Sequence, residues 1–153
     1  MNVNDMEILL VEDDPADAEL TTRSLRKEGL THKIVHARDG AEALELLFKK
    51  ATADSGALPN PLIVLLDLQL PRVSGHAVLK AIKGDERTKC IPVIVMTSSD
   101  HERDLSECYK LGVNSYVQKP VDLNRFQEAV KQVGTYWLKV NRTPPSAAAS
   151  AQR

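Results

Sequence analysis

The chain contains few cysteines and almost no net charge. Its 153 residues include only two cysteines, and Cys90 and Cys108 form no Cys-x-x-Cys pair. We therefore expect two reduced structural thiols in a cytoplasmic protein. Lys and Arg number 20 and Asp and Glu 21, for a net charge of -1. This balance gives no reason to expect a nucleic-acid partner or a role on a membrane surface.

The chain also lacks long apolar segments. The first five residues carry neither a basic segment nor an apolar core, so no signal peptide is expected. Every other apolar run is too short to cross a bilayer, and no internal repeat is present. A chain of this length fits one domain that can bury a core without disulfides. We expect a single domain over residues 1–142, followed by a Pro-, Ser- and Ala-rich tail over 143–153 that is disordered.

Strand-like and helix-like segments alternate five times, a pattern typical of an α/β domain with a parallel sheet. The predicted strands are Glu7–Val11, Lys33–Ala37, Leu62–Leu66, Pro92–Met96 and Ser115–Gln118. The predicted helices are Pro15–Glu28, Ala41–Lys50, Gly75–Lys83, His101–Leu111 and Leu123–Val140. Residues 51–61, rich in Ser, Gly and Pro, indicate a loop. The expected fold is a doubly wound five-stranded parallel sheet of order 2-1-3-4-5.

Acidic residues directly follow two of the most apolar segments. Asp67 comes after the run Leu62–Leu66, and Glu12, Asp13 and Asp14 come after Ile8–Val11. Unbroken apolar runs are typical of strands buried on both faces, and ligands of such sheets bind at the carboxyl ends of the strands. Carboxylates crowded at that edge cannot all stay ionised without a positive partner. The sequence therefore predicts a cation site.

Two further polar residues end the fourth and fifth predicted strands. In the order 2-1-3-4-5, Thr97 and Lys119 converge with the carboxylates on one edge. Mg²⁺ suits Asp13 and Asp67, with Glu12 accepting a hydrogen bond from a metal-bound water. A hydroxyl and an ammonium suit phosphoryl oxygens. Together these groups predict in-line phosphoryl transfer onto Asp67, giving an aspartyl phosphate.

The chain resembles the receiver domain of two-component response regulators over about residues 6–140. The motifs that carry the resemblance are Leu10-Val11-Glu12-Asp13-Asp14, Leu66-Asp67-Leu68-Gln69-Leu70-Pro71 with Gly75, Val95-Met96-Thr97-Ser98, and Tyr116 with Lys119-Pro120. The loop before the third strand and the ending Tyr136-Trp137-Leu138 look most similar to stand-alone receivers of bacterial phytochrome histidine kinases. The resemblance implies a flavodoxin-like fold and signalling by phosphorylation.

The resemblance also implies roles for individual residues. Asp67 is then the phosphoacceptor, and Mg²⁺ is held by Glu12, Asp13, Asp67 and the backbone carbonyl of Gln69. Thr97 contacts the phosphoryl group and Lys119 pairs with it. Two further implications concern the signal. Tyr116 is implied as a switch coupled to the Thr97 hydroxyl, and the peptide bond before Pro120 is implied to be cis.

Several features of the sequence also have a simpler interpretation. Asp14 precedes Pro15, so we read it as a helix N-cap rather than as a metal ligand. An aromatic such as Tyr116 is common in an edge strand for packing reasons alone. The apolar stripe of the last predicted helix mainly fits packing on the sheet. Apolar groups on more than one face near Tyr136 leave a homodimer, through the fourth helix, fifth strand and fifth helix, as a hypothesis.

Three other functions compete with a signalling receiver. A Mg²⁺-dependent phosphatase with an aspartyl nucleophile is the main alternative. Enzymes of that class resemble Asp-x-Asp, with the second carboxylate as general acid. Here Gln69 occupies the second position, and an amide cannot shuttle a proton. A flavodoxin-like carrier must cradle a phosphate in its first loop, where Glu12-Asp13-Asp14 would repel one. A phosphate-free pseudo-receiver would not need the full set of site residues. We therefore expect a non-enzyme that accepts phosphate from a histidine kinase, slowly loses it, and signals by protein contacts.

Overall fold

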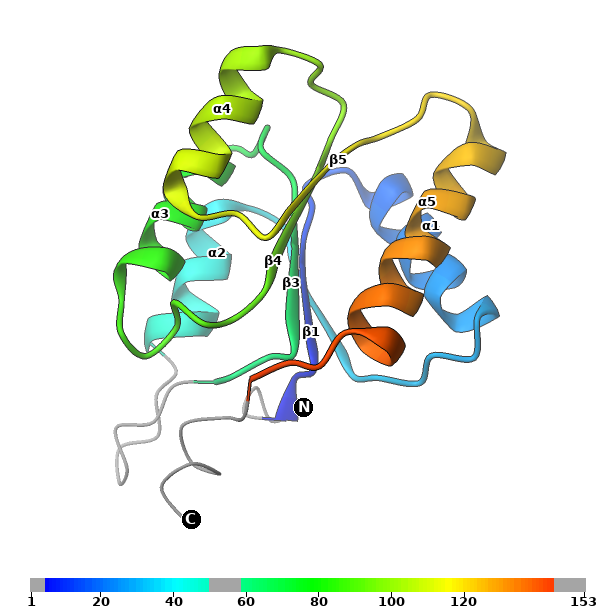
Figure 1. Ribbon diagram of the computed structural model, residues 1–153, viewed down its shortest axis with the longest axis horizontal. Coiled ribbons are helices and arrows are strands. Elements are labelled where there is room, and N and C mark those ends of the chain that lie inside the picture. The colour runs from blue at the N-terminus through cyan, green and yellow to red at the C-terminus, as the bar shows by residue number, and fades with distance from the viewer. Residues whose placement is uncertain (1–4, 50–58, 145–153) are drawn as a thin grey trace.

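The computed structural model describes residues 5–49 and 59–144, which form a parallel sheet between two layers of helices (Figure 1). The strands are β1 (Ile8–Val11), β2 (Ile34–Ala37), β3 (Ile63–Leu66), β4 (Val93–Thr97) and β5 (Ser115–Gln118). The helices are α1 (Pro15–Lys27), α2 (Gly40–Leu44), α3 (Gly75–Gly84), α4 (Glu102–Leu111) and α5 (Leu123–Thr135). The strand order β2-β1-β3-β4-β5, all parallel, confirms the predicted fold.

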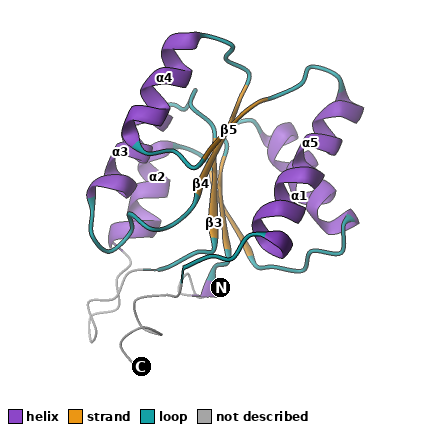
Figure 2. Ribbon diagram, in the orientation of Figure 1, coloured by secondary structure: helices purple, strands orange, loops and turns teal. Residues whose placement is uncertain are grey.

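The helices divide between the two faces of the sheet. Helices α2, α3 and α4 cover one face, while α1 and α5 pack together on the other (Figure 2). The central strands β1, β3 and β4 are buried along their whole length, which explains why their sequences are continuously apolar. Successive residues of each strand point to opposite faces and pack into two separate cores. Val64, for example, packs on the α2–α4 face and Leu65 on the α1–α5 face.

Helix ends are set by local sequence. The carboxylate of Asp14 accepts hydrogen bonds from the backbone N–H of Ala16 at 2.9 Å and of Asp17 at 3.4 Å, which confirms Asp14 as the N-cap of α1. Ser74 caps α3 in the same way through the N–H of Ala77. Helix α4 ends at Gly112, whose φ of 98° is a left-handed conformation that favours glycine.

Two predicted helices change their winding near the carboxyl end. Helix α2 continues as a π-helical segment over Glu45–Lys49, and α5 continues as another over Tyr136–Val140. The 3.6-residue apolar pattern does not reveal this change, because tertiary packing decides it. The predicted loop over 51–61 and the predicted tail over 143–153 lie largely outside the described residues. Within the described residues, none of the helices has both the length and the apolar character needed to cross a membrane.

Candidate functional site

The carboxyl ends of the central strands carry three carboxylates close together. Asp67 directly follows β3, and Glu12 and Asp13 directly follow β1, which pairs with β3 in register. One carboxylate oxygen from each of these residues lies within 4.8 Å of the others. Glu12 and Asp67 are buried, with 4% and 8% of their surfaces exposed, whereas Asp13 is exposed. The cluster thus combines two enclosed carboxylates with one that faces solvent.

Lys119 supplies the positive charge of the cluster. It follows β5, and its backbone N–H donates to the carbonyl of Thr97 at 2.7 Å. Its Nζ donates to Glu12 Oε1 at 2.5 Å, to Asp67 Oδ2 at 2.9 Å and to Asp17 Oδ2 at 3.1 Å. Only 9% of the Lys119 side chain is exposed. A lysine buried to this extent stays charged only because carboxylate partners compensate for its lost hydration.

The ionisation of Glu12 and Lys119 reflects burial opposed by pairing. Burial raises the pKa of Glu12 to about 7, with help from the charge of Asp67 and against the hydrogen bond from Lys119. Burial lowers the pKa of Lys119, but the hydrogen bonds and charges of Glu12 and Asp67 outweigh this effect and leave the pKa above its ordinary value. The lysine is therefore charged, and it holds the buried carboxylates together.

Backbone groups orient Asp67 from the other side. The N–H of Gln69 donates to Asp67 Oδ1 at 3.1 Å, so each carboxylate oxygen of Asp67 has a partner. Gly75, the first residue of α3, lies so close to this loop that a Cβ there would collide with the backbone of Asp67 and Leu68. The glycine allows α3 to begin directly against the loop that follows Asp67.

Thr97 and Tyr116 both reach the loop between β4 and α4. The hydroxyl of Thr97, which is fully buried, accepts from the N–H of Ser99 at 3.3 Å. The hydroxyl of Tyr116 donates to the carbonyl of Ser99 at 3.3 Å. The Ser99 hydroxyl in turn donates to Asp104 of α4 at 2.6 Å. The two residues predicted as a switch therefore meet at one loop residue.

Sequence reasoning missed the contact of Asp17 with Lys119. Asp17 lies in the first turn of α1, three residues after its N-cap. Its only signal in the sequence was its place close behind the acidic cluster, because the partner lies 102 residues away.

The prediction of a cis peptide before Pro120 is wrong: the described residues contain no cis peptide bond. Trans is the lower-energy form of an X-Pro bond, and Lys119 reaches all three carboxylates with it.

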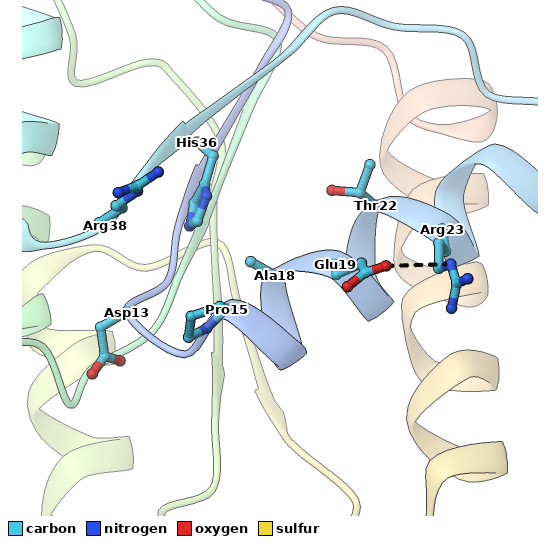
Figure 3. A pocket seen from close by; sticks show the side chains of 8 residues that line it. All are labelled: Asp13, Pro15, Ala18, Glu19, Thr22, Arg23, His36 and Arg38. Atoms are coloured by element: carbon cyan, nitrogen blue, oxygen red, sulfur yellow. Dashed lines mark ion pairs between the residues drawn. The ribbon is translucent and has the colours of Figure 1, made fainter.

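The open hollow near the site lies beside the carboxylates rather than over Asp67. A cavity of about 500 Å³ separates α1 from β2, with Asp13 at its edge and His36 and Arg38 on the strand side (Figure 3). An ion pair between Glu19 and Arg23 borders the helix side (Figure 3). The enclosed space lined by Glu12, Asp67 and Lys119 is only about 10 Å³. The structure therefore has an open hollow beside Asp13 and little free space between the side chains of Glu12, Asp67 and Lys119.

The comparisons with known proteins agree with this geometry. Residues 8–131 match the response regulator receiver domain, and the chain belongs to that family.

Among its relatives is the probable methanogenesis regulatory protein FilR2 of Methanothrix harundinacea, which is 43% identical over 137 residues, covering 90% of this chain and 86% of that protein. Response regulator Rcp1 of a Synechocystis species is 36% identical, covering 90% and 92%.

Two solved structures resemble the chain equally well. The Mn²⁺-bound form of Rcp1 has a TM-score of 0.81 at 36% identity, covering 90% of this chain and 98% of that one. The phosphorylated cyanobacterial phytochrome response regulator RcpA also has a TM-score of 0.81 at 36% identity, covering 90% and 97%. The predicted resemblance to receivers and to phytochrome response regulators is thereby confirmed.

Proposed function

We propose that Asp67 accepts a phosphoryl group from the phosphohistidine of a histidine kinase. The observation that carries the proposal is the environment of the Asp67 carboxylate, which is bonded by Lys119 and Gln69 beside two further carboxylates at an open edge of the sheet. An oxygen of Asp67 attacks phosphorus while the bond from phosphorus to the donor nitrogen breaks. The electron pair of that bond stays on the imidazole of the donor.

A divalent cation, Mg²⁺ in our proposal, fits the residues at this edge. Glu12, Asp13 and Asp67 offer the hard oxygen ligands that Mg²⁺ prefers, and the exposure of Asp13 leaves room for bound water. The backbone carbonyl of Gln69 would complete the protein ligands. Such a cation neutralises charge on the phosphoryl oxygens. Lys119 binds the same two buried carboxylates and would pair with a phosphoryl oxygen beside them.

The phosphoryl group would act on signalling through Thr97 and Tyr116. A phosphoryl oxygen attracts the Thr97 hydroxyl, which in the unphosphorylated chain accepts from the N–H of Ser99. Moving that hydroxyl changes the loop whose carbonyl also binds Tyr116. The Ser99–Asp104 hydrogen bond connects this loop to α4. The signal would therefore be a shift in population toward a different arrangement of α4 and β5. We propose that this chain signals by protein contacts and does not turn over a substrate as an enzyme does.

The partners are proposed from the relatives. RcpA is described as a phytochrome response regulator, which makes a phytochrome-type histidine kinase one candidate donor. FilR2 is named for regulation of methanogenesis, so histidine kinases of other kinds must be tested as donors together with a phytochrome-type kinase. A cytoplasmic site of action agrees with the predicted reduced thiols.

A homodimer through α4, β5 and α5 is also proposed. Leu105 and Tyr109 of α4 are exposed at 39% and 54%, and Tyr136 beyond α5 at 50%. Trp137 and Leu138, by contrast, pack partly against the α1–α5 core, so the end of α5 offers less apolar surface than its sequence suggests. Light scattering with and without a phosphoryl mimic tests the dimer, and a monomeric mass under both conditions contradicts it.

Phosphotransfer to the wild-type chain and to Asp67→Asn tests the central proposal. Radiolabelled phosphate should pass from a cognate kinase to wild type and not to the variant, and fluoroberyllate should bind wild type only with Mg²⁺. Asp85→Asn is a matched control, because Asp85 lies just beyond α3 and pairs with Arg87 away from the site. Labelling of Asp67→Asn equal to wild type, or fluoroberyllate binding in excess chelator, would sink the proposal.

A further inference from the structure

One ammonium group serves three carboxylates in this site. The Nζ of a charged lysine has three hydrogens and no acceptor. In Lys119 these hydrogens match three acceptors, on Glu12, Asp67 and Asp17. Every donor is therefore already occupied in the unphosphorylated chain. Lys119 can pair with a phosphoryl oxygen on Asp67 only if it gives up one of these bonds.

The three bonds differ in how easily they can be exchanged. The bond to Asp17 is the longest, at 3.1 Å against 2.5 Å to Glu12 and 2.9 Å to Asp67. The Asp17 side chain is 35% exposed, whereas those of Glu12 and Asp67 are 5% and 10% exposed. A carboxylate near solvent regains hydration when it loses a partner, but a buried one does not. Asp67 ceases to be a free carboxylate when it is phosphorylated, and of the two partners that remain carboxylates Asp17 is therefore the one that Lys119 loses at the smaller cost.

We propose that Asp17 is a positioning residue that competes with the phosphoryl group for Lys119. Before phosphorylation, Asp17 holds the third hydrogen of the ammonium and keeps Lys119 turned toward α1. When Asp67 carries a phosphoryl group, Lys119 exchanges Asp17 for a phosphoryl oxygen, and Asp17 becomes solvated. The proposal rests on the proposed phosphorylation of Asp67, and it gives the first turn of α1 a part in setting how stable the phosphorylated state is.

The competition makes two affinities move in opposite directions in Asp17→Asn. Loss of a negative charge should weaken Mg²⁺ binding to the unphosphorylated chain by about two- to fivefold, the size typical of a partly exposed ion pair. Release of Lys119 should tighten fluoroberyllate binding at saturating Mg²⁺ by about the same factor. Isothermal titration calorimetry measures both. A residue that merely supports the fold would weaken both affinities together.

Asp14→Asn is the matched control for charge. Asp14 lies at the start of the same helix and makes no bond to Lys119, and asparagine keeps the N-cap. Its effect on fluoroberyllate affinity should be clearly smaller than that of Asp17→Asn. Equal effects of the two variants, or weaker mimic binding by Asp17→Asn, overturn the role of Asp17. Failure of the wild-type chain to bind fluoroberyllate with Mg²⁺ instead overturns the proposed function itself.

Discussion

In the middle of the sheet Leu10, Leu65 and Ile94 lie side by side in register, with 5%, 2% and 0% of their surfaces exposed. Two residues beyond Leu10 and Leu65 along their strands, Glu12 and Asp67 are buried almost as completely, at 4% and 8%. The apolar row stabilises the fold because its side chains leave water. The charged row costs hydration energy, and Lys119 supplies the counter-charge that holds Glu12 and Asp67 together. Equal burial thus stabilises the fold in one row and costs hydration energy in the other.

Truncation of the apolar row should have the largest effect on stability. Leu65→Ala leaves a cavity between β3 and the α1–α5 layer, and we expect the free energy of unfolding to fall by about 3 kcal/mol. Chemical denaturation followed by circular dichroism measures this change. Leu105→Ala, at an exposed position of α4, is the control and should cost less than about 0.5 kcal/mol. Similar losses in the two variants would contradict the contrast between buried and exposed leucines.

Removal of Lys119 tests the charged row. Lys119→Ala leaves Glu12 and Asp67 without their counter-charge, and we expect a loss of about 2 kcal/mol in the presence of chelator. The raised pKa of Lys119 in the folded state means that its contribution is fully present below 10.5, its ordinary value, and disappears only as pH rises beyond it.

Unfolding at about pH 8.5, above the Glu12 pKa of about 7 and below the ordinary lysine value, therefore measures the contribution of Lys119 with Glu12 ionised. Added Mg²⁺ should restore more stability to Lys119→Ala than it adds to wild type, because the cation then meets no competing ammonium. Equal stabilisation of both chains by Mg²⁺ would show that the lysine and the cation do not share these carboxylates.

A small overpacking change tests the layer between α1 and α5. A Cβ on Gly134 would lie 2.6 Å from Leu25 Cδ2 and 2.8 Å from Leu30 Cδ1, so both leucine ends must shift. The gain in helix propensity offsets part of this cost, and Gly134→Ala should lose about 1 kcal/mol or less. Gly84→Ala meets no atom within 4 Å and serves as the control. Thermal unfolding should rank Gly84→Ala above Gly134→Ala, and the reverse order would show that the leucines move freely.

The two cysteines should differ in chemical reactivity, and this is the smallest of the expected effects. Cys108 is fully buried, and burial raises the pKa of its thiol to about 11. Because the thiolate is the reactive form, Cys108 of the folded chain should stay unmodified at pH 8 and react only as pH approaches the raised value. Cys90 is exposed and should react at once. Cys90→Ser should thus abolish fast labelling by a thiol reagent, and fast labelling that persists would place Cys108 within reach of solvent.

The strand order was expected from the fold class and not from local sequence. The amino-acid sequence by itself determined the alternation of strands and helices and the position of the carboxylates at the strand ends. It did so because these features depend on local signals: apolar runs four to five residues long, the Asp14-Pro15 cap and the carboxylates that directly follow β1 and β3. The family motifs added the proposed phosphoacceptor and metal ligands, of which the carboxylates of Glu12, Asp13 and Asp67 lie together in the structure.

Only the tertiary structure decided which groups share the Lys119 ammonium, since Asp17 and Lys119 are brought together by the packing of α1 beside the sheet. It also decided that Trp137 and Leu138 pack inward, that two helices end in π-helical segments, and that the bond before Pro120 is trans. Each of these outcomes depends on contacts between residues distant in sequence or on small energy differences between backbone forms, which local patterns do not record.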